Sequence, residues 1–194
     1  EDIKKNDPLQ EDLTIIVDEI DRLTKVVNQL LQFAKPGSEV KTSVRIGAVI
    51  HSTLVVLNHE AKQNKITTFC QIPNDLPEIA ADEGALKEVF FNLLRNAIQA
   101  MPSGGEIHIN AHYQPSSHAI QITVTDTGTG IAQGAFQKIF EPFYTTKQTG
   151  TGLGLSIVKK KLEDMEATIH AESNGHGASF VINFPLPEPL LVQT

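Results

Sequence analysis

The sequence predicts a two-layer α/β sandwich preceded by one long helix. Apolar residues near the start repeat at heptad spacing, and the proline–glycine pair Pro36–Gly37 ends this pattern. The rest of the chain intersperses helix-like and strand-like stretches. The last two strand-like stretches flank Asn174–Gly177, a glycine-containing turn that is typical of an antiparallel hairpin. Helices mixed with hairpins favour helices packed on one sheet.

The first 36 residues contain the long helix. Its apolar positions alternate spacings of four and three, which is the a/d pattern of a helix that packs against other helices. These positions are Leu9, Leu13, Ile16, Ile20, Leu23, Val27, Leu30 and Ala34. Val17, Val26 and Leu31 widen the stripe, which favours a four-helix bundle. We interpret residues 1–36 as half of a dimerisation element.

The first half of the following domain has three predicted elements, a helix, a strand and a second helix. Apolar residues recur at helical spacing over 44–63, and residues 66–72 alternate as in a strand. Asp82 is the expected N-cap of a strongly periodic helix over 83–101, which Pro102–Gly105 ends.

The second half begins with hairpin-like strands and ends with another hairpin. Its expected strands are 106–113, 119–125, 167–173 and 178–184. Between the two pairs, a glycine-rich segment contains a short helix around 132–140, and a further helix is expected over 154–165. The domain is expected over 38–186, and 187–194 form a tail.

Composition and charge exclude several classes of protein. With 16 basic and 23 acidic side chains the net charge is −7, whereas nucleic-acid binding needs a basic surface. The single cysteine, Cys70, excludes a disulfide framework. No apolar run reaches the roughly 18–20 residues that cross a bilayer. We expect a cytoplasmic chain that contacts neither nucleic acid nor membrane, and leave open whether the intact protein is membrane-anchored.

The helix over 83–101 has a polar face opposite its apolar stripe. This face consists of Glu88, Asn92, Arg95, Asn96 and Gln99. A solvated face is the ordinary interpretation, but two asparagines one turn apart cost helix stability. They would supply two neutral amide oxygens at one place, which suits a hydrated Mg²⁺ ion.

Three further motifs follow, and each has an alternative interpretation. Asp126–Ile131 places a carboxylate before two glycines at a strand end, or is a tight turn. Gly150–Leu155 is a glycine-rich helix start that suits an anion, or is a hinge; it matches neither the dinucleotide fingerprint nor the Walker A loop. Between them, Phe140–Lys147 combines an apolar anchor with a polar segment ending in lysine.

The ordered set resembles the N, G1, F and G2 boxes of sensor histidine kinases. "NLLRNAIQAMPSGG" and "FEPFYTTKQTGTGLGLSIV" resemble most the nitrogen-regulatory branch. The resemblance covers 38–186 and implies a Bergerat-type ATP-binding fold of the GHKL group. The first helix resembles the second helix of that family's dimerisation hairpin.

The resemblance also implies roles for individual residues. Asp126 would accept the adenine amino group, and Asn96 with Asn92 would hold Mg²⁺ between the phosphates. Lys147 would reach the phosphates from a mobile lid whose conformation Phe140 and Phe143 set. The full set of implied ATP-binding residues is Asn92, Asn96, Asp126, Gly128, Gly130, Ile131, Phe140, Phe143, Lys147, Gly150, Thr151, Gly152, Leu153 and Gly154.

The implied activity is phosphoryl transfer from Mg-ATP to a histidine, followed by relay to a response-regulator aspartate within a homodimer. The implied catalytic residues are Asn92, Asn96, Lys147 and Glu88. Related ATPases carry a water-activating glutamate where this chain has Asn92, which favours a kinase, although Glu88 one turn away could act as a base.

The family's phospho-accepting histidine belongs to an upstream helix that this chain lacks, and His59–Glu60 does not continue the corresponding motif. A GHKL-type ATPase and a non-catalytic nucleotide-binding dimerisation module remain alternatives.

Overall fold

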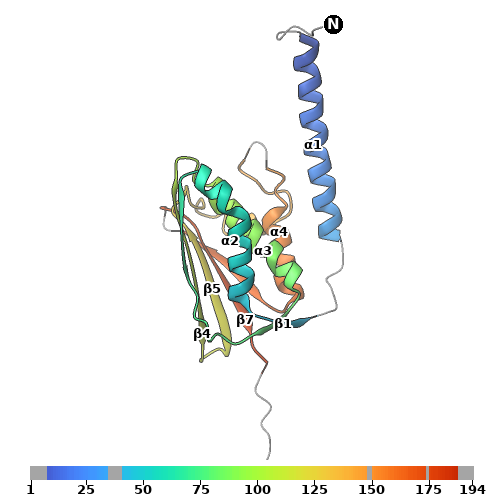
Figure 1. Ribbon diagram of the computed structural model, residues 1–194. Coiled ribbons are helices and arrows are strands. Elements are labelled where there is room, and N and C mark those ends of the chain that lie inside the picture. The colour runs from blue at the N-terminus through green and yellow to red at the C-terminus, as the bar shows by residue number, and fades with distance from the viewer. Residues whose placement is uncertain (1–7, 35–40, 148–149, 174, 188–194) are drawn as a thin grey trace, which may run out of the picture. The chain divides into compact units, whose positions relative to one another are not determined.

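We analysed a computed structural model that describes residues 8–34, 41–147, 150–173 and 175–187 (Figure 1). The chain divides into two compact units, Glu1–Pro36 and Gly37–Thr194. Each unit is described by itself.

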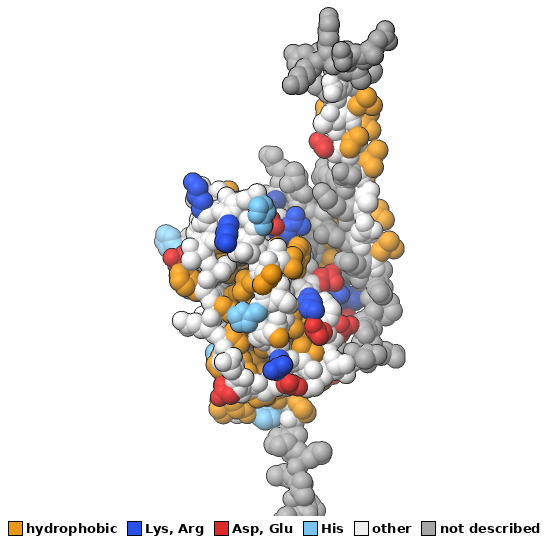
Figure 2. All heavy atoms as spheres, in the orientation of Figure 1, with side chains coloured by type: hydrophobic (Ala, Val, Ile, Leu, Met, Phe, Trp, Pro, Cys, Tyr) orange, Lys and Arg blue, Asp and Glu red, His pale blue; other side chains and the backbone are white. Residues whose placement is uncertain are grey.

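The described part of the first unit is one helix, α1 (Pro8–Ala34), as the heptad pattern predicts. Orange side chains line it in Figure 2. The exposed apolar residues of the predicted seam are Leu13, Ile16, Ile20, Leu23, Val27 and Leu30. The side chains of Leu9 and Ala34, the first and last predicted seam positions, lie outside the described part. A helix with such a stripe buries it only by packing against other helices.

The second unit is a two-layer α/β sandwich, which confirms the predicted fold class. Its helices α2 (Ile46–Gln63), α3 (Glu83–Gln99) and α4 (Gly154–Asp164) lie on one face of the sheet (Figure 1). The strands are β1 (Thr42–Val44), β2 (Ile66–Gln71), β3 (Ile79–Ala81), β4 (Gly105–Gln114), β5 (Ala119–Asp126), β6 (Thr168–Glu172) and β7 (Ser179–Pro185). The predicted strands and the three longer helices of this unit agree with these bounds within two residues.

The main sheet has the strand order β2-β4-β5-β7-β6. Strand β2 pairs with β4 in parallel, and the other neighbours are antiparallel. Strands β1 and β3 form a separate two-stranded pair that the sequence did not predict. Asp126, the last residue of β5, pairs with Ile107 of β4 and so lies at the C-terminal end of the central strand.

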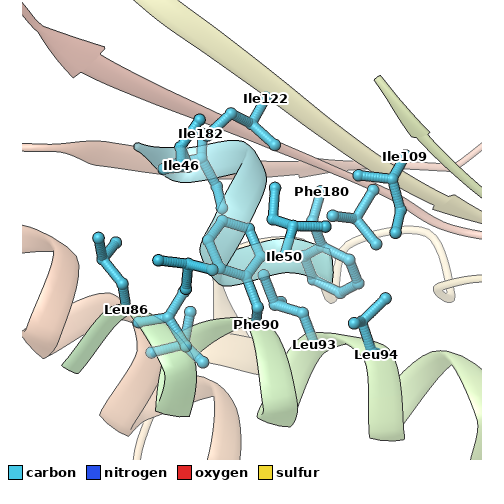
Figure 3. Packing of buried hydrophobic residues seen from close by; sticks show 14 of the residues in the cluster. Ile46, Ile50, Leu86, Phe90, Leu93, Leu94, Ile109, Ile122, Phe180 and Ile182 are labelled. Atoms are coloured by element: carbon cyan, nitrogen blue, oxygen red, sulfur yellow. The ribbon is translucent and has the colours of Figure 1, made fainter. Parts of the chain in front are cut away.

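The core lies between the helices and the sheet (Figure 3). Phe90 and Leu93 of α3 are fully buried, as are Ile50 of α2 and Ile122 and Ile182 of the sheet. Complete burial of such a side chain stabilises the fold by about 1.5–3 kcal/mol. Because these contacts fix the rotation of α3 about its axis, they also fix where its polar face points.

The predicted short helix around 132–140 is wrong in length. Only Lys138–Phe140 forms a helical turn, the 3₁₀ helix η1. Gly134 adopts a left-handed φ of +84°, which interrupts any α-helix before that turn. Of the predicted tail, residues 188–194 lie outside the described part. Within the described ranges, no helix is both long and apolar enough to span a membrane.

Candidate active site

The polar face of α3 is positioned by the helix's cap and by its buried face. Asp82 caps the helix, as predicted: its side chain accepts a hydrogen bond of 3.0 Å from the Ala85 N–H. Asn92 and Asn96 follow on the partly exposed side. The Asn92 side-chain nitrogen donates to the Glu88 carbonyl oxygen at 3.0 Å. This bond holds the Asn92 side-chain nitrogen against its own helix.

The N-terminus of α4 lies against the two asparagines. A Cβ atom placed on Gly154 would lie 3.5 Å from Asn92 Oδ1 and 3.9 Å from Asn96 Nδ2. The structure therefore brings together residues that are about sixty positions apart in sequence. Exposed N–H groups and the partial positive charge of a helix N-terminus favour anions there.

Lys147 contacts the same face of α3 from the segment before α4. Its Nζ donates to Gln99 Oε1 at 2.7 Å and to Asn96 Oδ1 at 3.5 Å. Partial burial of the ammonium lowers the pKa of Lys147 from its ordinary value, as does the positive charge of Arg95, while Asp126 opposes both effects. Gln99 was noted on the polar face but was not predicted as a site residue.

Glu88 is engaged in an ion pair. Its Oε2 lies 3.0 Å from Lys161 Nζ, and both side chains are about one quarter exposed. The pair joins α3 to α4. This contact favours a structural role for Glu88, and the predicted role as a base remains a prediction.

Asp126 is a buried carboxylate with a defined orientation. Only 4% of the residue is exposed. Its Oδ1 accepts hydrogen bonds from the N–H groups of Gly128 at 2.9 Å and Ala178 at 3.3 Å, and among the described residues Oδ2 has no hydrogen-bond partner. Burial raises the pKa of Asp126, while the two backbone bonds and the charge of Lys147 oppose this rise. The carboxylate can therefore accept a hydrogen bond from a ligand.

The glycines after Asp126 are required by close packing. A Cβ atom on Gly128 would lie 2.7 Å from the Ala100 carbonyl oxygen and 2.9 Å from Asp126 Oδ1. Gly130 has a φ of +71°, and a Cβ there would lie 2.7 Å from Ser173 Oγ. The next N–H, that of Ile131, donates to the same Ser173 oxygen at 3.2 Å. Gly130 and Ile131 thus pack on the turn between β6 and β7.

The segment between Phe140 and Gly152, which we call the lid, is anchored at both ends. Phe140 is buried and packs edge-to-face on Phe180, with ring centroids 6.4 Å apart. Phe143 is 61% exposed, and its N–H donates to the Gly152 carbonyl oxygen at 2.9 Å. Gly152 has a φ of +69°, and a Cβ there would overlap the Phe143 backbone. The two phenylalanines therefore differ: Phe140 is an anchor and Phe143 is open to a ligand.

The remaining predicted residues lie where the lid joins α4. A Cβ on Gly150 would overlap Thr145 Oγ1. The Leu153 N–H donates to Thr151 Oγ1 at 3.4 Å. The Leu153 side chain is fully buried, so only its backbone can face a ligand.

The residues that shape the Asp126 pocket from afar were missed. Ser173, Gly177 and Ala178 lie in the connection between β6 and β7, and nothing local in the sequence shows that they contact Asp126 or the glycines after it. The turn could be identified, but not its contact with Asp126.

The chain is similar in sequence to known proteins. A protein-family model described as "Histidine kinase-, DNA gyrase B-, and HSP90-like ATPase" matches residues 81–188. The signal transduction histidine-protein kinase AtoS of Escherichia coli (strain K12) is 36% identical over 93% of this chain and 30% of its own length. The sensor histidine kinase ZraS of the same strain is 36% identical over 89% of this chain and 37% of its own length. The chain thus spans less than two fifths of these curated relatives.

Solved structures give the same result. Full-length ShkA in complex with AMPPNP matches with a TM-score of 0.77 and 27% identity, over 94% of this chain and 40% of that one. Histidine kinase ThkA in complex with the response regulator protein TrrA matches with a TM-score of 0.76 and 27% identity, over 94% and 53%. The catalytic domain of ThkA matches with a TM-score of 0.68 and 29% identity, over 75% and 95%.

Proposed function

Because this chain belongs to the family of histidine kinase-, DNA gyrase B- and HSP90-like ATPases, we propose that it binds Mg-ATP as the catalytic part of a sensor histidine kinase. It would transfer the γ-phosphoryl group to a histidine on an upstream dimerisation helix, for relay to a response-regulator aspartate. The observation that carries the proposal is the approach of Gly154 to Asn92 and Asn96. The α4 N-terminus lies beside the side-chain oxygen of Asn92 and the side-chain nitrogen of Asn96, and this proximity supports a shared phosphate and metal site.

The adenine end of the nucleotide would lie at Asp126. Two backbone N–H groups hold its Oδ1, so Oδ2 can accept a hydrogen bond from an exocyclic amino group. Adenine carries such an exocyclic amino group. Gly128 and Gly130 let the backbone approach closely, as the first glycine motif requires.

The phosphates would lie between the α4 N-terminus and the lid, with Lys147 beside them. The residues present fit a Mg²⁺ ion: Asn92 and Asn96 supply neutral oxygens, and within the described part of the chain no three His, Cys, Asp or Glu side chains form an alternative metal cluster. Mg²⁺ takes few protein ligands and completes its shell with phosphate and water. When bound, it would neutralise charge on the phosphates.

Within this site the chain itself supplies positioning and charge. Asn96 would orient the metal–phosphate group, Lys147 would neutralise phosphate charge, and the lid would exclude water. Asn92 is an amide and cannot accept a proton from water, and the Glu88 carboxylate is paired with Lys161. Both observations favour transfer to a protein acceptor over hydrolysis.

The α1 helix and the relatives indicate which partners the chain would bind. The exposed seam of α1 suits a homodimer, and ThkA was solved with a response regulator. A response-regulator receiver domain is therefore the expected phosphate recipient, and the cytoplasm the expected location.

Two measurements test the proposal. A slowly hydrolysed ATP analogue is titrated into the chain with and without Mg²⁺, and saturable, metal-enhanced binding is expected. A helical hairpin carrying the acceptor histidine is then supplied with labelled ATP. Labelled histidine supports the kinase, whereas steady phosphate release without the hairpin would indicate an ATPase. Absence of binding would leave only a non-catalytic dimerisation module.

A further inference from the structure

Lys147 is the lid residue that reaches α3, and two hydrogen bonds hold its own backbone groups. The Lys147 N–H donates to Thr145 Oγ1 at 3.1 Å, and the Gly150 N–H donates to the Lys147 carbonyl oxygen at 3.2 Å. These two bonds fix the backbone N–H and the carbonyl oxygen of Lys147. Together with the Phe143–Gly152 bond at the base of the lid, they aim the lysine side chain across the site.

The short contact made by this ammonium is with Gln99, not with the asparagine. The distance to Gln99 Oε1 is 2.7 Å, against 3.5 Å to Asn96 Oδ1. Gln99 is the last residue of α3 and lies close to one helical turn after Asn96. The Gln99 side-chain oxygen therefore accepts a hydrogen bond from the Lys147 ammonium beside Asn96, the expected metal ligand.

We infer that Gln99 is a positioning residue, whose side-chain oxygen holds the Lys147 ammonium beside Asn96 so that the phosphate-binding cation is supplied by the lid. The ligand class is a nucleoside triphosphate, so the inference rests on the proposed function. A neutral amide suits this task. A glutamate would hold the lysine in a full ion pair and repel phosphate, whereas a lysine would repel Lys147. An amide holds the ammonium yet yields it to phosphate oxygens, which accept charge-assisted hydrogen bonds more strongly.

A double-mutant cycle tests the inference through nucleotide binding. Gln99→Ala is expected to weaken binding of the Mg-bound ATP analogue about threefold to tenfold, the effect of one partly exposed polar contact. In a Lys147→Ala background the same substitution should change binding less than about twofold. Equal losses in both backgrounds, or no loss in either, would overturn the inference. Gln137→Ala is the matched control, because Gln137 is exposed and its side chain makes no capping hydrogen bond.

A second measurement needs no nucleotide. Trypsin must take the lysine side chain into its own pocket, so the Gln99–Lys147 contact protects the bond after Lys147. Gln99→Ala should raise the rate of cleavage after Lys147 about threefold in the absence of ligand, and Gln137→Ala should not. An unchanged rate would contradict the inference. Faster cleavage in a chain that fails to bind the analogue would instead contradict the proposed function and support only the Gln99–Lys147 contact.

Discussion

The buried carboxylate of Asp126 accepts a hydrogen bond from the backbone N–H of Ala178, which lies 52 positions further along the chain. The bond ties the end of β5 to the start of β7 and fixes the direction of Oδ2. The sheet thus sets the position of the group proposed to select adenine. This position removes the carboxylate from water, and that burial destabilises its charged form.

Asp126→Asn separates the effect of the carboxylate on ATP binding from its effect on stability. Because burial raises the pKa of Asp126, the folded chain binds this proton more tightly than the unfolded chain does. The group's contribution to stability is therefore complete below the ordinary carboxyl pKa and is lost as pH rises through the raised value. At neutral pH the asparagine variant should melt at a higher temperature, with the gain disappearing in acid. Its affinity for ATP should fall by about 1.5–3 kcal/mol. Unchanged affinity in a calorimetric titration would place adenine elsewhere.

Asn96→Ala tests the metal site. Because the proposed role of its oxygen is to hold Mg²⁺, binding of Mg-ATP should weaken about tenfold more than binding of ATP in EDTA, an effect in the range found for altered metal surroundings. Asn110→Ala on β4, an exposed residue, is the matched control. Equal losses with and without metal would contradict the ligand role.

Gly152→Ala tests the base of the lid. Both Gly152 and Gly134 have a left-handed φ, +69° and +84°, but a Cβ on Gly134 meets nothing within 4 Å. Gly134→Ala should therefore cost about 1 kcal/mol of unfolding free energy from backbone strain alone. Gly152→Ala should cost about 2–4 kcal/mol, because overlap with Phe143 is added, and should also weaken nucleotide binding. Equal costs in urea denaturation would show that the Phe143 contact is dispensable.

Glu88→Gln tests whether the α3–α4 ion pair is structural. The loss of a partly buried pair with Lys161 should cost about 1 kcal/mol of stability and leave any phosphate release from ATP unchanged. Glu83→Gln is the control, because the Glu83–Lys87 pair is more exposed and its loss should have almost no effect. A large fall in phosphate release by the Glu88 variant would identify Glu88 as a base.

Leu23→Glu tests the proposed homodimer. Leu23 lies on the a/d seam of α1, whereas Ile15 is equally apolar, 66% exposed, and off the seam. A charge on the seam should raise the dimer dissociation constant at least about tenfold, because it would be buried between helices. Ile15→Glu should leave it nearly unchanged. Sedimentation equilibrium measures both, and identical behaviour of the two variants would contradict a heptad-mediated dimer.

Local patterns predicted most of the fold. The α3 helix was recognisable because its cap and its apolar stripe lie within one continuous stretch. The hairpin at the end was recognisable because a glycine-containing turn separates two alternating runs. Strands β1 and β3 were missed because three residues are too few to show alternation. The parallel pairing of β2 with β4 has no local signal, since α3 intervenes.

In the candidate site, too, local patterns predicted some residues and missed contacts between distant ones. Asn92 and Asn96 stand out because asparagine is unfavourable inside a helix, and the glycine motifs because several glycines cluster at element ends. The partnership of Gln99 with Lys147 joins residues 48 positions apart, and a polar residue at the end of a helix has no distinguishing feature until its partner is known.

The approach of Gly177 to Asp126 has a consequence beyond packing. A Cβ on Gly177 would overlap the Asp126 backbone oxygen, so the position of the proposed adenine-binding residue depends on the absence of a side chain at Gly177. Any side chain introduced there must push the carboxylate out of place. Substitutions at Gly177 are therefore expected to alter the purine preference proposed for this chain by moving Asp126 without replacing it.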